Sequence, residues 1–492
     1  MLGELLQGLA TVLTPQVLLL LLFGVSAGFL VGAMPGLTAT MAVALLVPLT
    51  FPFNASQGLS LLLAIYVGAV SGGLVPAILI NTPGTPASIA TTFDGYPMTK
   101  RGEAGKALSL ALLASVFGSL IGIAMLIALA PAISRLALGF SGPEYASLAI
   151  FGLTMAVGIS GKSLAKGMIA VLFGLSVSMI GLDPMLGSPR FTFDTVILQG
   201  GVPFVPMLIG MFAVSEAINR AVGVGIGNAA EAVLPKRFVL KLKEIARNWF
   251  LIIKSGLIGT FIGAIPGAGA DIASLVSYGE AKRSSKHPER FGTGINEGVI
   301  ASETANNAIM GGAMIPLLTL GIPGDAVTAV LLGAMMMHGV RTGPLIFQQN
   351  RAEVFVMYAA LIVSVVLFRL VAIAIIKPFS HIVRLKQSFI VPAVLILCFV
   401  GSFATGNNLW NLQAALIFGV IGFLMTATDF PVGPAVLGFI LGPLLEDRFR
   451  QALIISQGNF AVFFTRPISA VLLILSIVSV VYALRQRRKS SG

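Results

Sequence analysis

Proline-glycine pairs interrupt the apolar stretches of this sequence at four places, and the four breaks form two matched sets. The breaks are Pro35-Gly36, Pro83-Gly84, Pro266-Gly267 and Pro323-Gly324. The third follows the first by 231 residues (266 minus 35), and the fourth follows the second by 240 (323 minus 83). Proline removes a backbone donor and glycine admits dihedral angles that other residues avoid, so no helix runs through these breaks intact. We therefore expect two related halves, each with two broken apolar helices.

The apolar stretches around the breaks are extensive enough to place the chain in a membrane. Of the 492 residues, 56% are hydrophobic and 10% are charged, and the mean hydropathy is +0.97. A soluble protein carries about 25% charged residues, and one soluble core cannot hide this much apolar surface. Because several stretches are shorter than the roughly 20 residues that span a bilayer, we predict an all-α polytopic membrane protein with broken or re-entrant helices and about 10–14 membrane elements.

Basic residues indicate how the two halves are oriented. The net charge of +12 comes from short clusters between apolar stretches, which favours cytoplasmic loops over a nucleic-acid surface. The clusters are Lys100–Lys106, Lys162–Lys166, Lys236–Arg247, Lys282–Arg290 and Arg485–Lys489. After the first break of each half, the uncharged loop Phe51–Gln57 corresponds to the basic loop Lys282–Arg290. Loops that correspond in sequence but differ in charge predict two inverted-topology repeats.

This interpretation divides the chain into four parts. Residues 1–220 form the first membrane repeat, and residues 249–484 form the second. Residues 221–248 form a basic cytoplasmic linker, and residues 485–492 form a basic cytoplasmic tail. The start of the sequence lacks a basic segment and a small-residue cleavage site, so we expect the first apolar stretch to stay as a membrane helix. The single cysteine, Cys398, does not identify a redox compartment.

The second break of each half carries polar residues that favour a binding site. Asn81–Ser88 reads N-T-P-G-T-P-A-S, and Gly321–Thr328 reads G-I-P-G-D-A-V-T. The half-helix after each break would point free amides and a positive dipole end at an anion, and the released carbonyls could hold Na⁺. The alternative is a pair of proline kinks with local capping. Broken helices at corresponding places in two halves favour the binding site of a secondary transporter.

The candidate substrate-binding residues come from all four breaks. They are Asn81, Thr82, Pro83, Gly84, Thr85 and Ser88 in the first half, Gly321, Pro323, Gly324, Asp325 and Thr328 in the second, and Gly36, Thr38 and Gly267 at the breaks near Pro35 and Pro266. The breaks near Pro35 and Pro266 match each other only in part. They either complete the site or turn the chain between two packed helices.

Acids and amides in apolar segments are candidates for coupling transport to an ion. Glu303 lies in the sequence A-S-E-T-A-N-N-A, and helical spacing places Asn306 and Asn307 on its face. Asp271 follows the third break. Ionisable residues inside a membrane are costly, and we interpret them as functional. Carboxylate and amide oxygens suit a cation such as Na⁺, and a titrating Glu303 suits H⁺. The alternative is an interhelical hydrogen-bond cluster.

The sequence provides no motif for catalysis. It has no phosphate-binding G-x-x-x-x-G-K-[ST] motif, no set of Ser, His and Asp or of Cys and His for nucleophilic catalysis, and no metal-ligand spacing. We therefore expect a protein that is not an enzyme, with Na⁺ or H⁺ as coupling ion and no other cofactor. Arg369, an isolated cation in an apolar stretch, is either a substrate-binding cation or a side chain that snorkels or pairs.

Several motifs resemble those of a known family. They are G-A-M-P-G-L-T-A-T, N-T-P-G-T-P-A-S-I-A-T-T-F-D-G-Y-P-M, K-H-P-E-R-F-G, A-N-N-A, L-L-T-L-G-I-P-G and F-F-T-R-P-I-S. Together they resemble the large membrane subunit of the tripartite tricarboxylate transporters (TctA-like) over nearly the whole chain. The resemblance implies a bacterial inner-membrane permease that works with a small four-helix membrane subunit and a periplasmic binding protein that captures a carboxylate. Asp271 and Asp325 stand where this resemblance leads us to expect small or polar residues.

These features predict an ion-gradient-driven secondary transporter that imports a citrate-like tri- or dicarboxylate by alternating access. The resemblance leaves tricarboxylates, dicarboxylates and aromatic acids open as substrates. The alternative is a stand-alone channel or exporter for small organic anions, which would pass flux without a binding protein. A membrane enzyme or an assembly scaffold, the third class, would need a convergent catalytic group that the sequence does not provide.

Overall fold

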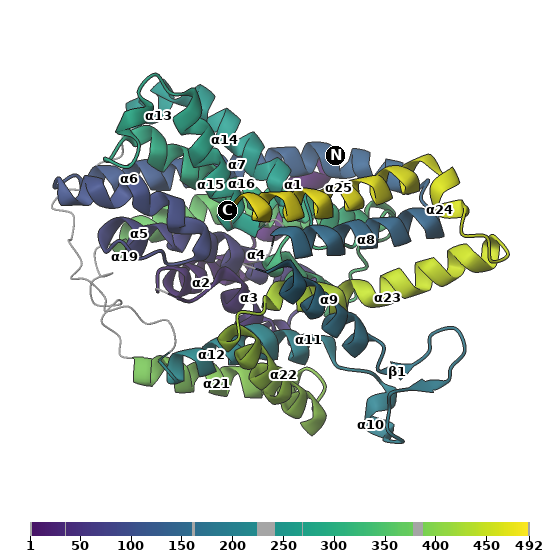
Figure 1. Ribbon diagram of the computed structural model, residues 1–492. Helices are drawn as coiled ribbons and strands as arrows, with labels where there is room; N and C mark the ends of the chain where they lie inside the picture. The colour runs from purple at the N-terminus through teal and green to yellow at the C-terminus, as the bar shows by residue number, and fades with distance from the viewer. Residues whose placement is uncertain are drawn as a thin grey trace.

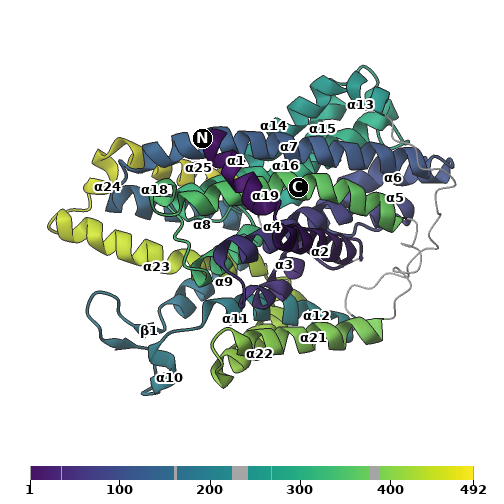
Figure 2. The ribbon, with the colours of Figure 1, turned by 180° about the vertical axis from the view of Figure 1, so that it is seen from behind.

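The computed structural model describes residues 2–34, 36–159, 163–223, 242–267, 269–376 and 387–490. Within these ranges the chain is a bundle of helices, and its strands form one short antiparallel hairpin. Strand β1 (Gly181–Leu182) pairs with β2 (Pro189–Arg190), with Gly181 opposite Arg190. Most of the long helices lie roughly along one common axis (Figures 1 and 2). The expected all-α architecture is confirmed.

Six helices in the described ranges are long and apolar enough to cross a membrane. They are α2 (Pro15–Gly32), α4 continued by α5 (Ala55–Gly72 and Leu74–Leu79), α7 (Ala104–Ala137), α11 continued by the π-helical η3 and by α12 (Phe204–Leu208, Ile209–Val214 and Ser215–Ala221), α19 (Arg351–Ile376) and α22 (Leu409–Ala427). Six shorter apolar helices accompany them. These belong to α3 (Ala39–Leu46) with the turn η1 (Pro48–Thr50), α9 (Leu164–Ser178), α14 (Trp249–Gly263), α17 (Ala326–Met337), α21 (Gln387–Ala404) and α25 (Pro467–Ser490). The chain is a multi-pass membrane protein.

The other helices connect these segments or lie among them. They are α1 (Leu2–Val12), α6 (Ile89–Lys100), α8 (Gly142–Ile159), α10 (Val196–Gln199), α13 (Leu242–Arg247), α15 (Gly269–Ser284), α16 (Asn296–Leu320), α18 (Ile346–Gln349), α23 (Val432–Ile455) and α24 (Val462–Thr465), with the turns η2 (Pro86–Ser88) and η4 (Pro288–Arg290). Among them, α16 is buried over almost its whole length.

All four proline-glycine breaks separate two helices, as the sequence predicts. α2 gives way to α3, whose first turn is capped by Thr38, because its Oγ1 accepts a hydrogen bond from the Met41 amide (3.1 Å). The other breaks separate α5 from α6, α14 from α15 and α16 from α17. Pro316 does not end its helix and lies inside α16. Pro35 and Ala268 lie outside the described residues.

The long helices of each half pack against the other half. Between the halves, α7 lies along α16 and α19 lies along α4. Within each half, α2 packs on α4 and α14 packs on α16. Glycines permit this close approach: a Cβ atom at Gly118 or Gly122 of α7 would collide with the backbone of α16, and one at Gly28 of α2 would collide with the backbone of α4. Small residues at helix contacts are how membrane helices pack when lipid supplies no hydrophobic driving force. α4 and α16 therefore form the interlocked centre of the bundle.

Two of the predicted cytoplasmic clusters meet at one end of the bundle. Arg101 follows α6 and donates from Nη1 to the Thr293 carbonyl oxygen (2.6 Å), so the Lys100–Lys106 cluster contacts the loop that follows Lys282–Arg290. α6 and α13 lie at this end, and α24 and the β-hairpin lie at the opposite end (Figures 1 and 2). Of the other clusters, Lys162 and residues 224–241 lie outside the described residues. The predicted tail begins within α25, which continues to Ser490.

Candidate functional site

The loop between α5 and α6 folds back onto the helix that precedes it. The backbone at Asn81 is left-handed (φ +56°), and the Thr82 amide donates to the Pro76 carbonyl oxygen (3.3 Å). The Gly84 amide donates to the Gly73 carbonyl oxygen (3.3 Å). Amides of the loop thus pair with carbonyls of the broken helix, which a buried backbone requires.

The loop between α16 and α17 repeats this geometry. Gly321 is left-handed (φ +72°), and the Ile322 amide donates to the Pro316 carbonyl oxygen (3.2 Å). Each of these residues follows its counterpart in the first loop by 240 residues (321 minus 81, for example). The match between the two loops therefore extends from sequence to backbone conformation.

Each loop rests on the end of the first broken helix of its own half. A Cβ atom at Gly84 would meet the Gly32 carbonyl oxygen, and one at Gly324 would meet the Gly263 carbonyl oxygen. These carbonyls belong to the last residues of α2 and α14. In the second half, the Gly267 amide also donates to the Gly324 carbonyl oxygen (2.8 Å). The first break of each half thus belongs to the same loop cluster as the second.

An arginine from a distant helix lies at the first break. Gly36 and Gly267 share a φ of +82°, and a Cβ atom at Gly36 would lie 2.6 Å from Nη2 of Arg220. Arg220 is buried in α12 and pairs with Glu216 (Nε to Oε1, 3.2 Å). Arg220 is not among the site residues predicted from the sequence, because no local pattern relates α12 to residue 36.

The hydroxyl groups of the first loop are inside the protein. Thr85 and Ser88 are buried, and their Oγ atoms lie 3.3 Å apart, whereas Asn81 is exposed. Neither Thr85 nor Ser88 accepts a capping hydrogen bond from the helical turn that follows it. The turn η2 itself pairs the amides that lead into α6, because the Ser88 amide donates to the Thr85 carbonyl oxygen (3.0 Å) and the Ile89 amide donates to the Pro86 carbonyl oxygen. The hydroxyl groups of Thr85 and Ser88 are thus not used for capping, and a hydroxyl group can donate a hydrogen bond to an anion.

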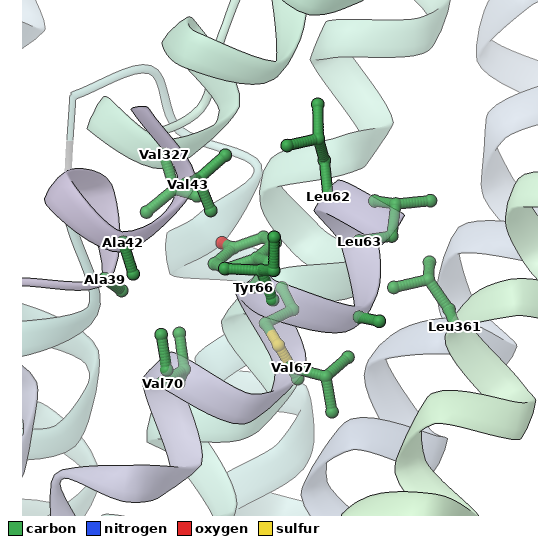
Figure 3. Packing of buried hydrophobic residues seen from close by; sticks show 14 of the residues in the cluster. Ala39, Ala42, Val43, Leu62, Leu63, Tyr66, Val67, Val70, Val327 and Leu361 are labelled. Carbon is green, nitrogen blue, oxygen red and sulfur yellow. The ribbon is translucent and has the colours of Figure 1, made fainter. Parts of the chain in front are cut away.

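The second loop carries a buried carboxylate of its own. Asp325 Oδ1 accepts a hydrogen bond from the Thr328 amide (2.7 Å), and the Asp325 amide donates to Thr328 Oγ1 (2.9 Å), so the pair caps α17. Asp325 Oδ2 accepts from the hydroxyl group of Tyr66 in α4 (2.8 Å). Figure 3 shows Tyr66 next to Val43 of α3 and Val327 of α17. At the position where the first loop carries the non-capping Thr85, the second loop carries Asp325, which caps its helix.

Glu303 lies in a buried polar cluster. Its carboxylate accepts hydrogen bonds from Thr91 Oγ1 (2.5 Å), Ser115 Oγ (3.2 Å) and Asn307 Nδ2 (3.3 Å). The side-chain oxygen of Asn307 accepts from Ser71 Oγ (2.6 Å). All five side chains are 0% exposed. They come from α4, α6, α7 and α16, so the cluster joins helices of both halves.

The other predicted coupling residues are placed differently. Asn306 is fully buried beside Asn307, and neither atom of its amide group has a hydrogen-bond partner in the described part of the chain. Asp271 is exposed in the first turn of α15 and is not a member of the Glu303 cluster. Arg369 is half-buried on α19. Within the described ranges, no three His, Cys, Asp or Glu side chains gather as metal ligands.

Comparison with sequence models of known protein families shows which family the chain belongs to. The sequence model of the tripartite tricarboxylate transporter TctA family matches residues 18–437. The chain belongs to this family. The resemblance found in the sequence motifs is thereby confirmed, and the match includes both proline-glycine loops and the Glu303 cluster. Membership makes the chain a component of a tripartite transport system.

Two curated relatives of this TctA-family protein come from Agrobacterium vitis. One, described as an uncharacterized 52.8 kDa protein in the TAR-I ttuC' 3' region, is 35% identical over 482 residues, which are 97% of this chain and 95% of the relative. The other, described as an uncharacterized protein in the TAR-II ttuC' 3' region, is 36% identical over 226 residues, which are 46% of this chain and 93% of that protein. No solved structure matches the chain.

Asp94 is a buried acid of this TctA-family protein that is not among the site residues predicted from the sequence. Its Oδ1 accepts hydrogen bonds from the amides of Gly292 (3.0 Å), Gly294 (2.7 Å) and Ile295 (2.9 Å). Its Oδ2 accepts from the Tyr278 hydroxyl group (2.8 Å). These amides lead into α16, so Asp94 fixes the start of the helix that carries the Glu303 cluster. Its partners lie in the other half of the chain, where no local signal points.

Proposed function

We propose that this chain is the permease of a tripartite transporter in the bacterial inner membrane, and that it imports a tri- or dicarboxylate by alternating access. Its membership of the TctA family supports a role in carboxylate transport. The observation that carries the proposal is the pair of loops at Asn81–Ser88 and Gly321–Thr328. They are matched in sequence and backbone and are largely buried by protein, where non-helical backbone is tolerated at membrane depth.

The two loops offer different chemistry to an anion. The first carries the buried hydroxyl groups of Thr85 and Ser88, neither of which caps the helical turn that follows, and it has no acidic side chain. In the second, Asp325 already holds the start of α17. We therefore assign the first loop to a substrate carboxylate and the second to shaping the cavity and to cation binding through its released carbonyls.

The proposal includes two inverted-topology repeats. α7 and α19 occupy corresponding positions in the two halves, and so do α4 and α16. The packing of α7 on α16 is therefore matched by the packing of α19 on α4, which supports two related repeats. The end that holds Lys100–Lys106 and Lys282–Arg290 is assigned to the cytoplasm, because basic loops remain there. A movement of one repeat against the other would expose the loop cluster alternately to each side.

The Glu303 cluster is the proposed coupling site. An isolated carboxylate inside a membrane is costly, and here three donors hold it in place. A proton on Glu303, or a Na⁺ ion among the carboxylate and the amide and hydroxyl oxygens, would neutralise it. The unpartnered amide group of Asn306 provides an oxygen for the second possibility.

The proposal requires partners. A periplasmic binding protein would deliver the carboxylate, and a small four-helix membrane subunit would complete the membrane complex. The test is uptake of labelled citrate, succinate and benzoate into proteoliposomes that hold this chain with both partners, with Na⁺ and H⁺ gradients imposed separately. Uptake that requires the binding protein and one gradient is the expected result. Flux through this chain alone, without a gradient, would favour the channel or exporter.

A further inference from the structure

A cavity borders the second proline-glycine loop at the end of the bundle opposite the Lys100–Lys106 cluster. Its volume is about 510 Å³, which lies in the range of small-molecule sites. Gly321 of the loop, Thr342, Ser178, Tyr145, Phe204 and Arg448 are among the residues that line it. Arg448 is the positively charged residue among the described lining residues, and none of these residues is acidic.

Arg448 is held in position but keeps its charge available. Its guanidinium group lies over the ring of Tyr145 (5.2 Å to the centroid), and its Nη1 donates to Gln451 Oε1 (2.9 Å). Neither partner is an anion, and among the described residues no carboxylate forms an ion pair with Arg448. The guanidinium group therefore retains donors in the fork geometry that binds a carboxylate.

The neighbouring charges on α23 pair with one another instead. Arg450 Nη1 lies 2.8 Å from Asp183 and 3.0 Å from Glu446, and Arg190 lies 2.6 Å from Glu446. This ion-pair cluster fixes the β-hairpin to α23. Asp447 lines an adjoining cavity of about 510 Å³, which also contacts Arg448, but it does not line the cavity at Gly321.

A comparison with α11 and α12 shows why Arg448 has no acidic partner on its own helix. Pro434, Gly438 and Arg448 follow Pro206, Gly210 and Arg220 by 228 residues each (448 minus 220, for example). Both glycines pack against a backbone carbonyl, that of Val171 for Gly438 and that of Ala415 for Gly210. Arg220 pairs with Glu216, four residues earlier. The corresponding position before Arg448 (216 plus 228) is Leu444, which has no charge.

We infer that Arg448 is a carboxylate-binding residue of a vestibule that leads to the second loop. The inference rests on the proposed function, which supplies the direction of transport, and it adds a cation to a site whose two loops carry none. The aromatic and aliphatic lining of the cavity suits the carbon skeleton of an organic acid, and Arg448 suits one of its carboxylate groups. The ligand class is therefore a small organic carboxylate.

The test compares Arg448→Gln, Arg448→Lys and Arg341→Gln with the wild type in the proteoliposome assay. Arg448→Gln is expected to raise KM at least about tenfold, because a charge-assisted hydrogen bond is lost. Arg448→Lys, which keeps the charge but not the fork, should give an intermediate KM. Arg341 is exposed next to Thr342 and does not line the cavity, so Arg341→Gln controls for loss of one charge at this end. A KM for Arg448→Gln within about twofold of the wild type would overturn the inference while the proposed function stands.

A binding measurement separates this inference from the proposed function. The melting temperature of the purified chain in detergent is measured with citrate, succinate and benzoate. If a carboxylate raises the Tm of the wild type and of Arg341→Gln but not of Arg448→Gln, the inference is supported even if no uptake is found. If no carboxylate raises the Tm of the wild type, or if Arg448→Gln responds equally, the inference fails. Elution of each variant as a single species in size-exclusion chromatography verifies that it is folded.

Discussion

The Tyr66 hydroxyl group donates a hydrogen bond to Asp325 Oδ2 across 2.8 Å, and both side chains are buried. Tyr66 belongs to α4 in the first half, and Asp325 belongs to the proline-glycine loop of the second. The other oxygen of Asp325 caps α17 through Thr328. Both carboxylate oxygens thus have donors, which a buried anion needs. The second loop is held by the central helix of the first half.

Tyr66→Phe tests this connection. Removal of the hydroxyl group leaves a buried carboxylate with one donor fewer, so we expect the free energy of unfolding to fall by about 1–3 kcal/mol. Tyr358→Phe is the matched control, because Tyr358 is 0% exposed and its hydroxyl group has no hydrogen-bond partner within the described ranges. That variant should be neutral or slightly stabilised. Thermal unfolding in detergent measures both, and equal Tm values for the two variants would argue against the connection.

Alanine at Gly84 or Gly324 should abolish uptake without preventing membrane insertion. Neither residue has a positive φ, so the reason is close packing: the new methyl group would collide with the Gly32 carbonyl oxygen or the Gly263 carbonyl oxygen. Gly279→Ala is the matched control, because a Cβ atom there meets nothing within 4 Å. Uptake and the amount of inserted protein are measured together. Normal uptake by Gly84→Ala would show that the loops tolerate displacement and are not the site.

The sequence predicted the loops well because their signals are local. Proline and glycine determine where a helix must end, and all four breaks separate helices in the structure. The constant separation of 240 residues even extends to the left-handed residues Asn81 and Gly321. The Glu303 and Asn307 side chains also meet as helical spacing predicts.

The partners of these residues could not be predicted from one sequence. Thr91 and Ser115 contact Glu303 from more than 180 residues away in the chain, and Tyr66 contacts Asp325 from 259 residues away. Such contacts depend on how α4, α6 and α7 pack around α16, which local composition does not encode. The environment of Asp271 could not be predicted either: it follows a break in the sequence, and the structure places it exposed in the first turn of α15 and outside the Glu303 cluster.

Asp94→Asn should loosen the loop that leads into α16. One carboxylate oxygen of Asp94 accepts from three backbone amides and the other from Tyr278. An asparagine side chain has one oxygen and an NH₂ group that cannot accept. We expect trypsin to cleave at Lys282–Arg290 about tenfold faster or more, because bonds to a charged group are lost. Glu289→Gln, in which an exposed charge is removed from the same loop, should leave the cleavage rate unchanged. Unchanged cleavage in Asp94→Asn would mean that the loop is held by other contacts.

Glu303→Gln separates ion coupling from a structural hydrogen-bond cluster. Glutamine has nearly the shape of glutamate but neither binds a proton at neutral pH nor carries the charge that attracts Na⁺. If Glu303 couples transport, the response of uptake to the driving ion should fall by about tenfold or more in Glu303→Gln. The KM for the carboxylate should change little, because the substitution removes an interaction with the ion and not with the substrate. Glu289→Gln is the matched control, because Glu289 is an exposed acid outside the cluster, and it should behave as the wild type.

The measurement is uptake at fixed carboxylate with the Na⁺ and H⁺ gradients varied independently. Loss of the response to one gradient alone in Glu303→Gln identifies the coupling ion. If Glu303→Gln lowers only the Tm and keeps the full response to both gradients, the cluster is structural. If Glu303→Gln does lose the response to a gradient, Ser115→Ala shows whether the charge is responsible. This variant removes one donor to the Glu303 carboxylate but keeps the charge. Loss of one hydrogen bond should weaken the ion response less than loss of the carboxylate. Coupling through the charge therefore predicts that the ion response is largest in the wild type, smaller in Ser115→Ala and smallest in Glu303→Gln.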